Sequence, residues 1–333
     1  MGYKIAVLGA TGAVGREMIN VLEEYQIPVD ELKLLASARS AGQTIPFAGK
    51  DVAVEEAKED SFEGMDFVLG AVQNPMAVKF APHIVKSGAV FIDNSSAFRQ
   101  DPDVPLVVPE INGSDAFTHK GIIANPNCST IITMVAVGAL AKISPIETMV
   151  ASTYQAVSGA GQPGLEELSR QLDDLHEGRT PEVKTFPAQI ALNVIPYIGS
   201  YKDNGYTTEE MKMQNEGRKI LHLPGLRVTC TCVRVPVMRS HSVSLLVRTR
   251  DRITVEQARE LIAAAPGCRL VDDLASKVYP MPLDTSDQDL VFVGRIRPDL
   301  IDEKGLNIWC CGDQVRKGAA TNAVQIAELV TKL

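Results

Sequence analysis

The chain reads KIAVLGATGAVG from Lys4 to Gly15. The apolar first part predicts a short buried strand, and a helix is expected at about residues 16–24 after the glycines. A strand, a glycine turn and a helix in this order are typical of the start of a dinucleotide-binding unit. There, Gly9 permits a tight turn, Gly12 lets a pyrophosphate approach the backbone, and Gly15 lets the helix pack closely on the strand.

Strand and helix patterns alternate through the rest of the first 127 residues. Strand-like runs are expected at residues 32–36, 67–71, 90–93 and 106–108, with a helical pattern at residues 75–87. Alternation of this kind predicts a parallel sheet with crossover helices.

The pattern changes after Cys128. Long runs rich in β-branched residues at 148–154, 227–235 and 241–249 predict a larger sheet, mixed or antiparallel. The tail at residues 318–333 is apolar along one helical side, and a last helix of this kind often returns to the first domain.

The sequence therefore predicts an α/β protein of two domains. A Rossmann-type domain with a parallel sheet is expected at residues 1–127, completed by a C-terminal helix at about 314–333. An α+β catalytic and dimerisation domain with a large mixed sheet is expected at residues 128–313.

Composition excludes several classes of protein. The 333 residues carry a net charge of −8, which argues against nucleic acid as a partner. We expect no membrane span, because no apolar run is long enough, and no secretory leader, because Met1–Lys4 passes directly into the first strand. Six cysteines without zinc-finger spacing predict buried free thiols, no metal site and a reducing cytoplasm.

The loop after the second predicted strand indicates the cofactor. Residues 34–40 read LLASARS, so no acid is present to hold the ribose hydroxyls of NAD. Arg39 and Ser40 suit the 2′-phosphate of NADP, with a solvated loop arginine as the alternative. Charge matching therefore favours NADP over NAD.

Cys128 lies in the run NPNCST at residues 125–130, directly before an apolar stretch. Pro126 interrupts the preceding structure and Asn127 can cap, so a helix is expected to begin at the thiol. The partial positive charge of a helix N-terminus favours the thiolate. A nucleophilic cysteine and a dinucleotide together suggest hydride transfer to or from a thioester; a small buried core residue is the alternative.

Seven strings in order resemble the aspartate-semialdehyde dehydrogenase family over essentially the whole chain. They are GATGAVG at 9–15, DNSSAFR at 93–99, VPEIN at 108–112, ANPNCST at 124–130, YQAVSGAG at 154–161, CVRVPV at 232–237 and HS at 241–242.

The resemblance implies a reaction. NADPH reduces L-aspartyl-4-phosphate to L-aspartate 4-semialdehyde and phosphate through a cysteine thioester. This step serves the biosynthesis of lysine and diaminopimelate, threonine, methionine and isoleucine. A cytoplasmic homodimer is implied, with a tetramer as the alternative.

The resemblance also implies catalytic roles. Cys128 would attack the acyl phosphate, and Asn127 would cap the helix and donate to an oxyanion or phosphate. Gln155 would orient the substrate, and His241 would do general acid–base work. Satisfied, structural histidines are favoured for the others, His83, His119, His176 and His222.

Four charged residues would hold the anionic substrate. The resemblance implies that Arg234 takes the α-carboxylate in a two-pronged contact, while Arg99 and Lys212 hold the phosphate. Glu209 would take the α-ammonium. Glu210 is a competing candidate, although the spacing of three from Lys212 favours Glu209.

Eleven residues are expected to contact the cofactor. Those of the glycine turn would bind the pyrophosphate, the next two the 2′-phosphate, and the rest the nicotinamide side or neighbouring groups: Gly9, Thr11, Gly12, Ala13 and Val14; Arg39 and Ser40; Ser158, Gly159, Gln314 and Asn322.

Two other functions remain open from the sequence. One is a reductase for a different acyl phosphate, such as N-acetyl-glutamyl phosphate, although the Gln155 and Glu209/Lys212 segments are not expected there. The other is a catalytically dead paralogue kept for binding or regulation. It is disfavoured because Cys128, Gln155 and His241 are all present.

Overall fold

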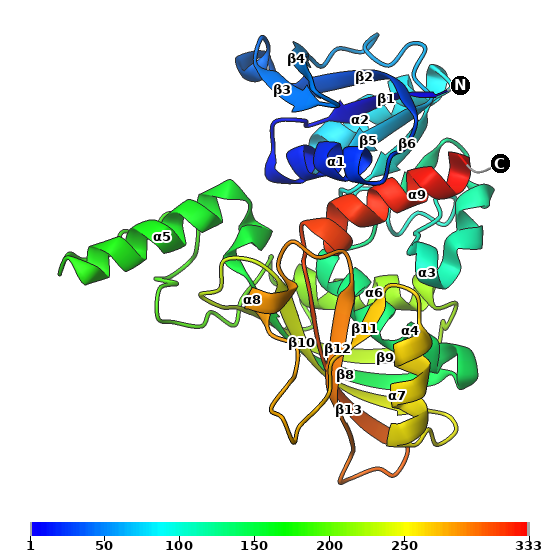
Figure 1. Cartoon of the computed structure of the whole chain (residues 1–333), viewed down its shortest axis with the longest axis vertical. Helices are drawn as coiled ribbons and strands as arrows, with labels where there is room; N and C mark the ends of the chain where they lie inside the picture. The colour runs from blue at the N-terminus through cyan, green and yellow to red at the C-terminus, as the bar shows by residue number, and fades with distance from the viewer. Residues whose placement is uncertain (1, 332–333) are drawn as a thin grey trace. The chain divides into compact units, whose positions relative to one another are not determined.

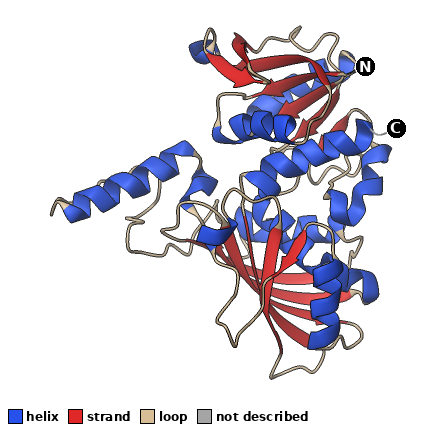
Figure 2. Cartoon of the chain, viewed as in Figure 1, coloured by secondary structure: helices blue, strands red, loops and turns tan. Residues whose placement is uncertain are grey.

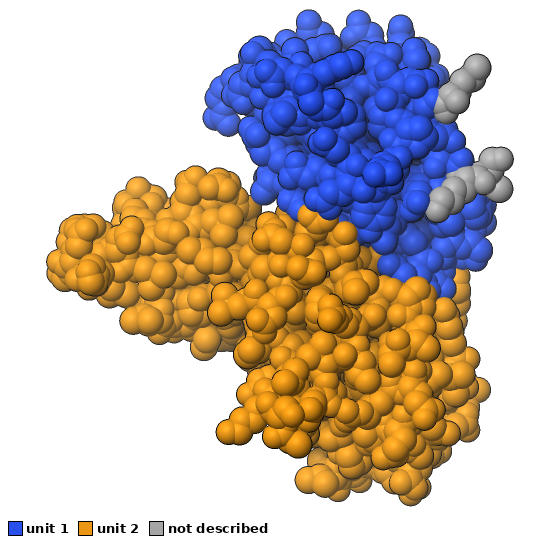
Figure 3. Space-filling view, in the orientation of Figure 1, with its two compact units in different colours: residues 1–127, 319–333 blue, residues 128–318 orange. Residues whose placement is uncertain are grey.

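The computed structural model describes residues 2–331. The chain divides into two compact units, one of residues 1–127 and 319–333 and the other of residues 128–318 (Figure 3). Each unit is built around a sheet of its own, drawn in red in Figure 2.

The first unit contains a seven-stranded sheet with the order β3-β4-β2-β1-β5-β6-β7. All neighbouring strands are parallel except β3 and β4, so the predicted parallel sheet is confirmed. The strands are β1 (Tyr3–Leu8), β2 (Val29–Ala36), β3 (Thr44–Phe47), β4 (Lys50–Glu56), β5 (Phe67–Gly70), β6 (Val90–Asp93) and β7 (Ile122–Ala124).

Helices cover both faces of this sheet. Helices α1 (Ala13–Glu24) and α9 (Thr321–Thr331) lie side by side (Figure 1) and share a core with alternate residues of β1, Ile5 and Val7. Helix α2 (Asn74–Lys86) packs on the opposite face, against Ala6 and Leu8. A strand buried on both faces needs apolar residues throughout, which explains the continuous apolar run. A short helix, α3 (Pro109–Asn112), precedes β7.

Some local predictions for this unit were wrong. Residues 106–108 form no strand but a single parallel bridge from Leu106 to Ala124, because prolines at both ends of the segment limit the pairing. Helix α1 begins at Ala13 rather than at residue 16, since the extended Gly12 is its N-cap. The β3–β4 hairpin, largely exposed, was not predicted.

The second unit contains a six-stranded sheet with the order β11-β12-β13-β10-β8-β9. Its pairs β8/β9 and β11/β12 are parallel and the others antiparallel, which confirms a mixed sheet. The strands are β8 (Ile146–Gln155), β9 (Arg227–Arg234), β10 (His241–Thr249), β11 (Cys268–Leu270), β12 (Val291–Pro298) and β13 (Gly305–Gly312).

Helices α4 (Cys128–Ile143), α6 (Thr208–Ile220) and α7 (Val255–Ala264) pack together against this sheet. Helix α4 is buried on nearly all sides, which its continuous apolar sequence requires. Helix α5 (Gln162–His176) extends away from the sheet, and α8 (Pro282–Thr285) is a single turn (Figure 1).

The predicted helical tail is confirmed over most of its length. A π-helical turn at Arg316–Ala320 leads into α9, and residues 332–333 lie outside the described residues. All six cysteines are free. Within the described part of the chain, no helix has the length and apolar character needed to cross a membrane.

Candidate active site

The glycine turn between β1 and α1 is shaped for a phosphate. Gly9 has a φ of +91°, and a Cβ there would lie 2.4 Å from the carbonyl oxygen of Ala71. A Cβ on Gly15 would lie 2.2 Å from the carbonyl oxygen of Gly9, so turn and helix meet closely. Gly12 caps α1, whose first turn carries no acidic side chain. The helix N-terminus therefore presents backbone N–H groups without a competing carboxylate, which suits a dinucleotide pyrophosphate.

The loop after β2 lies against this turn. Arg39 is exposed in a 3₁₀ turn at Ala38–Ser40, and the Thr11 hydroxyl donates to Oγ of Ser40 over 3.5 Å. A cation and hydroxyl groups thus stand beside the phosphate turn, where the sequence lacks an acid. These residues fit NADP by their charge.

Two predicted ligands of the first unit join an internal network instead. Arg99 is buried, and its Nε and Nη2 atoms donate to the carbonyl oxygens of Asn125 and Asn94, each over 2.9 Å. Asn322 donates to the carbonyl oxygen of Val107 over 2.9 Å and to Oδ1 of Asn125 over 2.6 Å. Their roles toward phosphate and cofactor stay predictions.

The thiol of Cys128 lies at the first residue of α4, as predicted, and is partly exposed. Gly318 in the π-helical turn lies against it, because a Cβ on Gly318 would come within 3.0 Å of the Cβ of Cys128. Single π-turns often occur at functional sites. The glycine leaves the helix N-terminus and its thiol uncrowded.

The backbone of Ala156 holds two of the predicted site residues. Its N–H donates to Nδ1 of His241 over 3.0 Å, and its carbonyl oxygen accepts from Nη1 of Arg234 over 2.6 Å. Ala156 follows β8, Arg234 ends β9 and His241 begins β10, so three strands of one sheet bring these groups together.

Burial and neighbouring charges shift the pKa values of His241 and Arg234. His241 is fully buried, which together with the nearby Arg234 lowers its pKa to about 3, against a smaller opposing effect of Glu209. Burial also lowers the pKa of Arg234, while the charges of Cys128 and Glu209 raise it. Arginine stays protonated in proteins, so a cation stands near the thiol and beside a neutral imidazole.

Helix α6 brings a carboxylate and an ammonium to the same place. Nε2 of Gln155 lies 3.3 Å from Oε1 of Glu209, whose Oε2 accepts from Nζ of Lys212 over 2.8 Å. Glu210 instead forms a capping box with Thr207 and accepts from a backbone N–H of β9. The geometry thus separates the two glutamates, with Glu209 beside Gln155 and Glu210 at the helix cap.

Gly159 forms part of the wall of the site. A Cβ at this position would lie 2.6 Å from Nη1 of Arg234 and 3.2 Å from Cε1 of His241. The ring of Phe186 covers the guanidinium of Arg234, with its centroid 5.9 Å away. The absence of a side chain on Gly159 therefore leaves room for Arg234 and His241 on this side.

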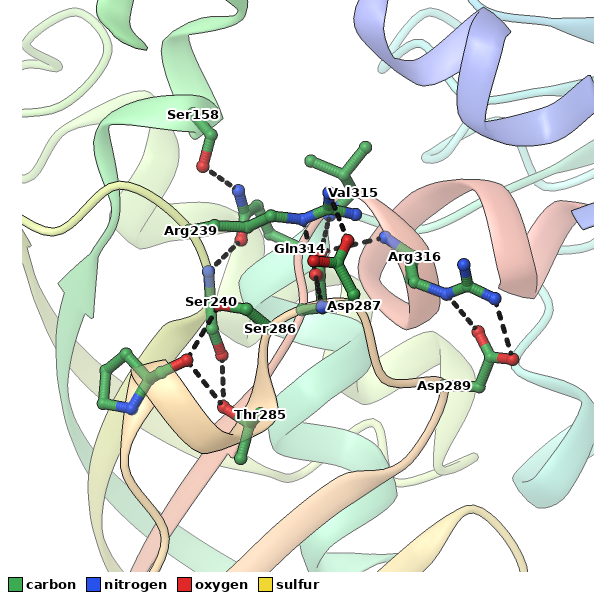
Figure 4. Close-up of polar contacts among 12 residues, drawn as sticks. Ser158, Arg239, Ser240, Thr285, Ser286, Asp287, Asp289, Gln314, Val315 and Arg316 are labelled. Carbon is green, nitrogen blue, oxygen red and sulfur yellow. Dashed lines mark hydrogen bonds and ion pairs between the residues drawn. The ribbon is translucent and has the colours of Figure 1, made fainter. Parts of the chain in front are cut away.

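Gln314 connects the turn that contains Ser158 with the start of β10 (Figure 4). Its Nε2 donates to the hydroxyl of Ser158, and its Oε1 accepts from the N–H of Ser240 over 2.9 Å. The neighbouring carboxylate of Asp313 accepts from Arg239 and from backbone N–H groups. Cofactor contact by Gln314 stays a prediction.

The structure thus groups the predicted residues in two sets. The second unit brings together Cys128, Gln155, Ser158, Gly159, Glu209, Lys212, Arg234, His241 and Gln314; the first holds Gly9, Thr11, Gly12, Ala13, Val14, Arg39, Ser40, Arg99, Asn127 and Asn322. Sequence reasoning missed the backbone of Ala156, Phe186, Asp313 and Gly318. Only Gly318, a glycine at the start of the helical tail, carried a signal that could have been used.

Two family models match the chain. The semialdehyde dehydrogenase NAD binding domain matches residues 4–119, and the semialdehyde dehydrogenase dimerisation domain matches residues 137–317.

Similar proteins of known name cover the whole chain. The aspartate-semialdehyde dehydrogenase of Aquifex aeolicus is 50% identical over 100% of this chain and 99% of the relative, and that of Bacillus subtilis is 46% identical over 100% and 98%. A crystal structure of aspartate semialdehyde dehydrogenase II from Vibrio cholerae, complexed with ASA, is 44% identical in sequence, with a TM-score of 0.97. The match covers 100% of this chain and 99% of the other. The enzyme from Candida albicans with NADP is 25% identical over 99% of both chains, with a TM-score of 0.76.

Proposed function

The chain belongs to the aspartate-semialdehyde dehydrogenase family, and from this premise we propose that it reduces L-aspartyl-4-phosphate to L-aspartate 4-semialdehyde with NADPH through a thioester on Cys128. The observation that carries the proposal is the thiol at the N-terminus of α4, in one unit with Arg234, Gln155 and His241. Such a reaction serves the biosynthesis of lysine and diaminopimelate, threonine, methionine and isoleucine.

NADP is proposed over NAD because of the loop after β2. Arg39 and Ser40 stand beside the glycine turn, and residues 34–40 contain no acid that would repel a 2′-phosphate. The bound cofactor supplies hydride to the carbonyl carbon. The named Candida albicans relative with NADP supports the same choice.

The thiolate of Cys128 attacks the acyl phosphate. The N-terminus of α4 and the cation of Arg234 favour the charged form of the sulfur. Phosphate is weakly basic and therefore leaves readily once the sulfur has added. Gln155 orients the substrate, His241 does general acid–base work, and Asn127 donates to an oxyanion or to phosphate.

Charged side chains divide the rest of the substrate between them. Arg234 binds the α-carboxylate and Glu209 the α-ammonium. Lys212 and Arg99 bind phosphate. Because Nζ of Lys212 is paired with Glu209 in the free protein, Lys212 exchanges this carboxylate for the phosphate when the substrate binds.

We assign cofactor binding to the first unit, completed by α9, and catalysis and dimerisation to the second. The face of the second sheet away from α4 is exposed and almost uncharged at its centre, where Val150, Tyr154 and Trp309 lie. Large exposed apolar surfaces of this kind mark protein interfaces, and a second copy of the chain fits the matched dimerisation domain. A homodimer is therefore proposed, with a tetramer as the alternative.

One assay tests the proposal. Phosphate-dependent reduction of NADP by aspartate semialdehyde is measured for the wild type and for Cys128→Ala, with N-acetyl-glutamyl semialdehyde as the competing substrate. We expect the wild type to turn over aspartate semialdehyde but not the N-acetylated substrate. We expect the variant to turn over neither. Preference for the N-acetylated substrate would assign the chain a different acyl phosphate, and a wild type inactive with both would refute an enzymatic role.

A further inference from the structure

Asn125 directly follows β7, three residues before Cys128, and is fully buried. Its backbone N–H donates to the carbonyl oxygen of Asp93 over 2.8 Å, and its own carbonyl oxygen accepts from Nε of Arg99 over 2.9 Å. Pro126 comes next, and its ring fixes one of its own backbone angles and restricts the conformation of Asn125. The position of Asn125 is therefore passed on to Cys128 through a short and stiff segment.

The side chain of Asn125 links three further segments. Its Nδ2 donates to Oδ1 of Asn94 over 2.6 Å and to the carbonyl oxygen of Ala319 over 3.1 Å. Its Oδ1 accepts from Nδ2 of Asn322 on α9 over 2.6 Å. Because a backbone carbonyl can only accept, the contact with Ala319 fixes which end of the amide faces it. Both ends of this buried amide are thus held in one orientation.

The turn that contains Ala319 bounds the space around Cys128. Ala319 belongs to the π-helical turn at Arg316–Ala320, which leads into α9. A Cβ on the preceding residue, Gly318, would come within 3.0 Å of the Cβ and 3.3 Å of the Cα of Cys128. A displacement of Ala319 would therefore move the backbone that lies against the nucleophile.

Asn125 connects the two segments through which the chain passes between its units. The first unit ends at Asn127 and resumes at Ala319, while the second runs from Cys128 to Gly318. Within the first unit, the amide of Asn125 joins the segment that leads to Cys128 with the segment that follows Gly318. One side chain thus fixes both the chain that carries the thiol and the turn that lies against it.

We propose that Asn125 is a positioning residue for Cys128, which holds the thiol at the start of α4 and holds the turn at Gly318 in place against it. This inference rests on the proposed function, in which Cys128 is the nucleophile, and adds a residue that acts through the thiol. Nucleophilic attack is sensitive to displacements of about 1 Å, so a misplaced sulfur reacts slowly even where the substrate binds normally. A misplaced sulfur also loses the helix N–H groups that favour the thiolate.

A matched pair of asparagines tests the proposal. Asn112 of α3 is also buried in the first unit, and its side chain makes three hydrogen bonds, with Leu106, Val108 and Asp115. Asn112→Ala therefore removes as many side-chain hydrogen bonds as Asn125→Ala and is the control for a purely structural loss. With aspartate semialdehyde, we expect Asn125→Ala to lose at least about tenfold in kcat, with KM within about twofold, and Asn112→Ala to keep the kcat of the wild type.

A second measurement does not depend on turnover. Alkylation of Cys128 by iodoacetamide is followed from about pH 5 to pH 9 by mass spectrometry of its peptide, in the folded proteins. We expect Asn125→Ala to react at least about threefold more slowly than the wild type at pH 7, with the midpoint of its pH profile moved upward. Asn112→Ala should react as the wild type does. If Asn125→Ala does not fold, Asn125→Ser, which keeps a hydroxyl at the site, is measured in its place with the same expectation.

Alkylation profiles that match between the two variants would overturn the proposal and make Asn125 part of the fold only. A raised KM with unchanged kcat would also overturn it, because the amide would then act on ligand binding. An inactive wild type would instead refute the proposed function, and the alkylation profiles alone would then decide the role of Asn125.

Discussion

Under the proposed function, the two units bind an anion in different ways. The first would use backbone N–H groups at the N-terminus of α1, which Gly9 and Gly12 expose, and the exposed Arg39 would add selectivity for the 2′-phosphate. The second uses buried side chains, among them Arg234 and Glu209, held by strand ends and by each other. Backbone donors need only a local turn, whereas buried charges need partners from several elements.

Substitutions should therefore have different effects in the two units. In the first unit, a side chain added at Gly9 or Gly15 would meet backbone atoms, so substitutions at these glycines should disrupt the turn. In the second unit each polar side chain of the site also satisfies another, so a single change alters several contacts.

Cys128→Ser, in the second unit, should cause the largest loss of turnover. A hydroxyl is a far weaker nucleophile than a thiolate, so turnover falls by at least about a thousandfold while fold and NADP binding persist. Mass spectrometry of the wild type with acyl phosphate, cofactor omitted, should find the acyl group on the Cys128 peptide. An adduct on another cysteine would refute Cys128 as the nucleophile.

Within the second unit, Arg234 and Lys212 should respond to different ligands. Arg234→Ala should lower kcat/KM for aspartate semialdehyde, and Lys212→Ala should lower kcat/KM for inorganic phosphate. Each loss should be tens- to a hundredfold, or about 2–3 kcal/mol. Arg234→Lys should not fully rescue, because an ammonium lacks the two-pronged geometry. If Lys212→Ala impairs the semialdehyde and spares phosphate, the division of the pocket is wrong.

Acid should destabilise the second unit through His241. Its pKa falls from 6.5 to about 3 on folding. The unfolded chain therefore gains the proton first, and stability present above pH 6.5 is lost progressively as the pH falls toward 3. Between pH 7 and pH 5 the wild type should lose about 2 kcal/mol more than His241→Gln in urea unfolding. Equal losses would indicate an imidazole that is charged in the folded state.

Lowering the pH should have the opposite effect on stability through a buried carboxyl of the first unit. Burial raises the pKa of Asp93 above 3.8, although hydrogen bonds from Ser95 oppose the shift. The folded protein then binds the proton more tightly, and Asp93 contributes stability as the pH falls through its raised pKa. Asp93→Asn should remove this contribution, as unfolding measured at several acidic pH values would reveal.

The smallest effect belongs to the exposed arginine of the first unit. Arg39→Glu should raise the Kd of NADPH by about tenfold and change that of NADH much less, because only NADPH carries the 2′-phosphate. Lys50→Glu, an exposed position of β4 in the same unit, serves as the control for general charge effects. Equal losses for both cofactors would make Arg39 structural only.

Prediction from the sequence succeeded where the signal was contiguous. The Gly9–Gly15 turn, the helix beginning at Cys128 and the strand His241–Thr249 all appear as expected, because each depends on neighbours along the chain. Residues 106–108 misled the prediction, because three apolar residues between prolines resemble a strand but pair only at Leu106.

Local patterns along the chain specify the reactive groups: a cysteine at a helix start, a glycine turn without a following acid, and arginines in the strings that resemble the family. The pairing of distant strands specifies which of these groups lie together. The pairing of Ala156 with His241 spans 85 residues, and that of Arg234 with Ala156 spans 78. The parallel pairing of β8 with β9 and the antiparallel pairing with β10 bring these strand ends together. Contacts across such separations depend on sheet pairing, which no local pattern specifies.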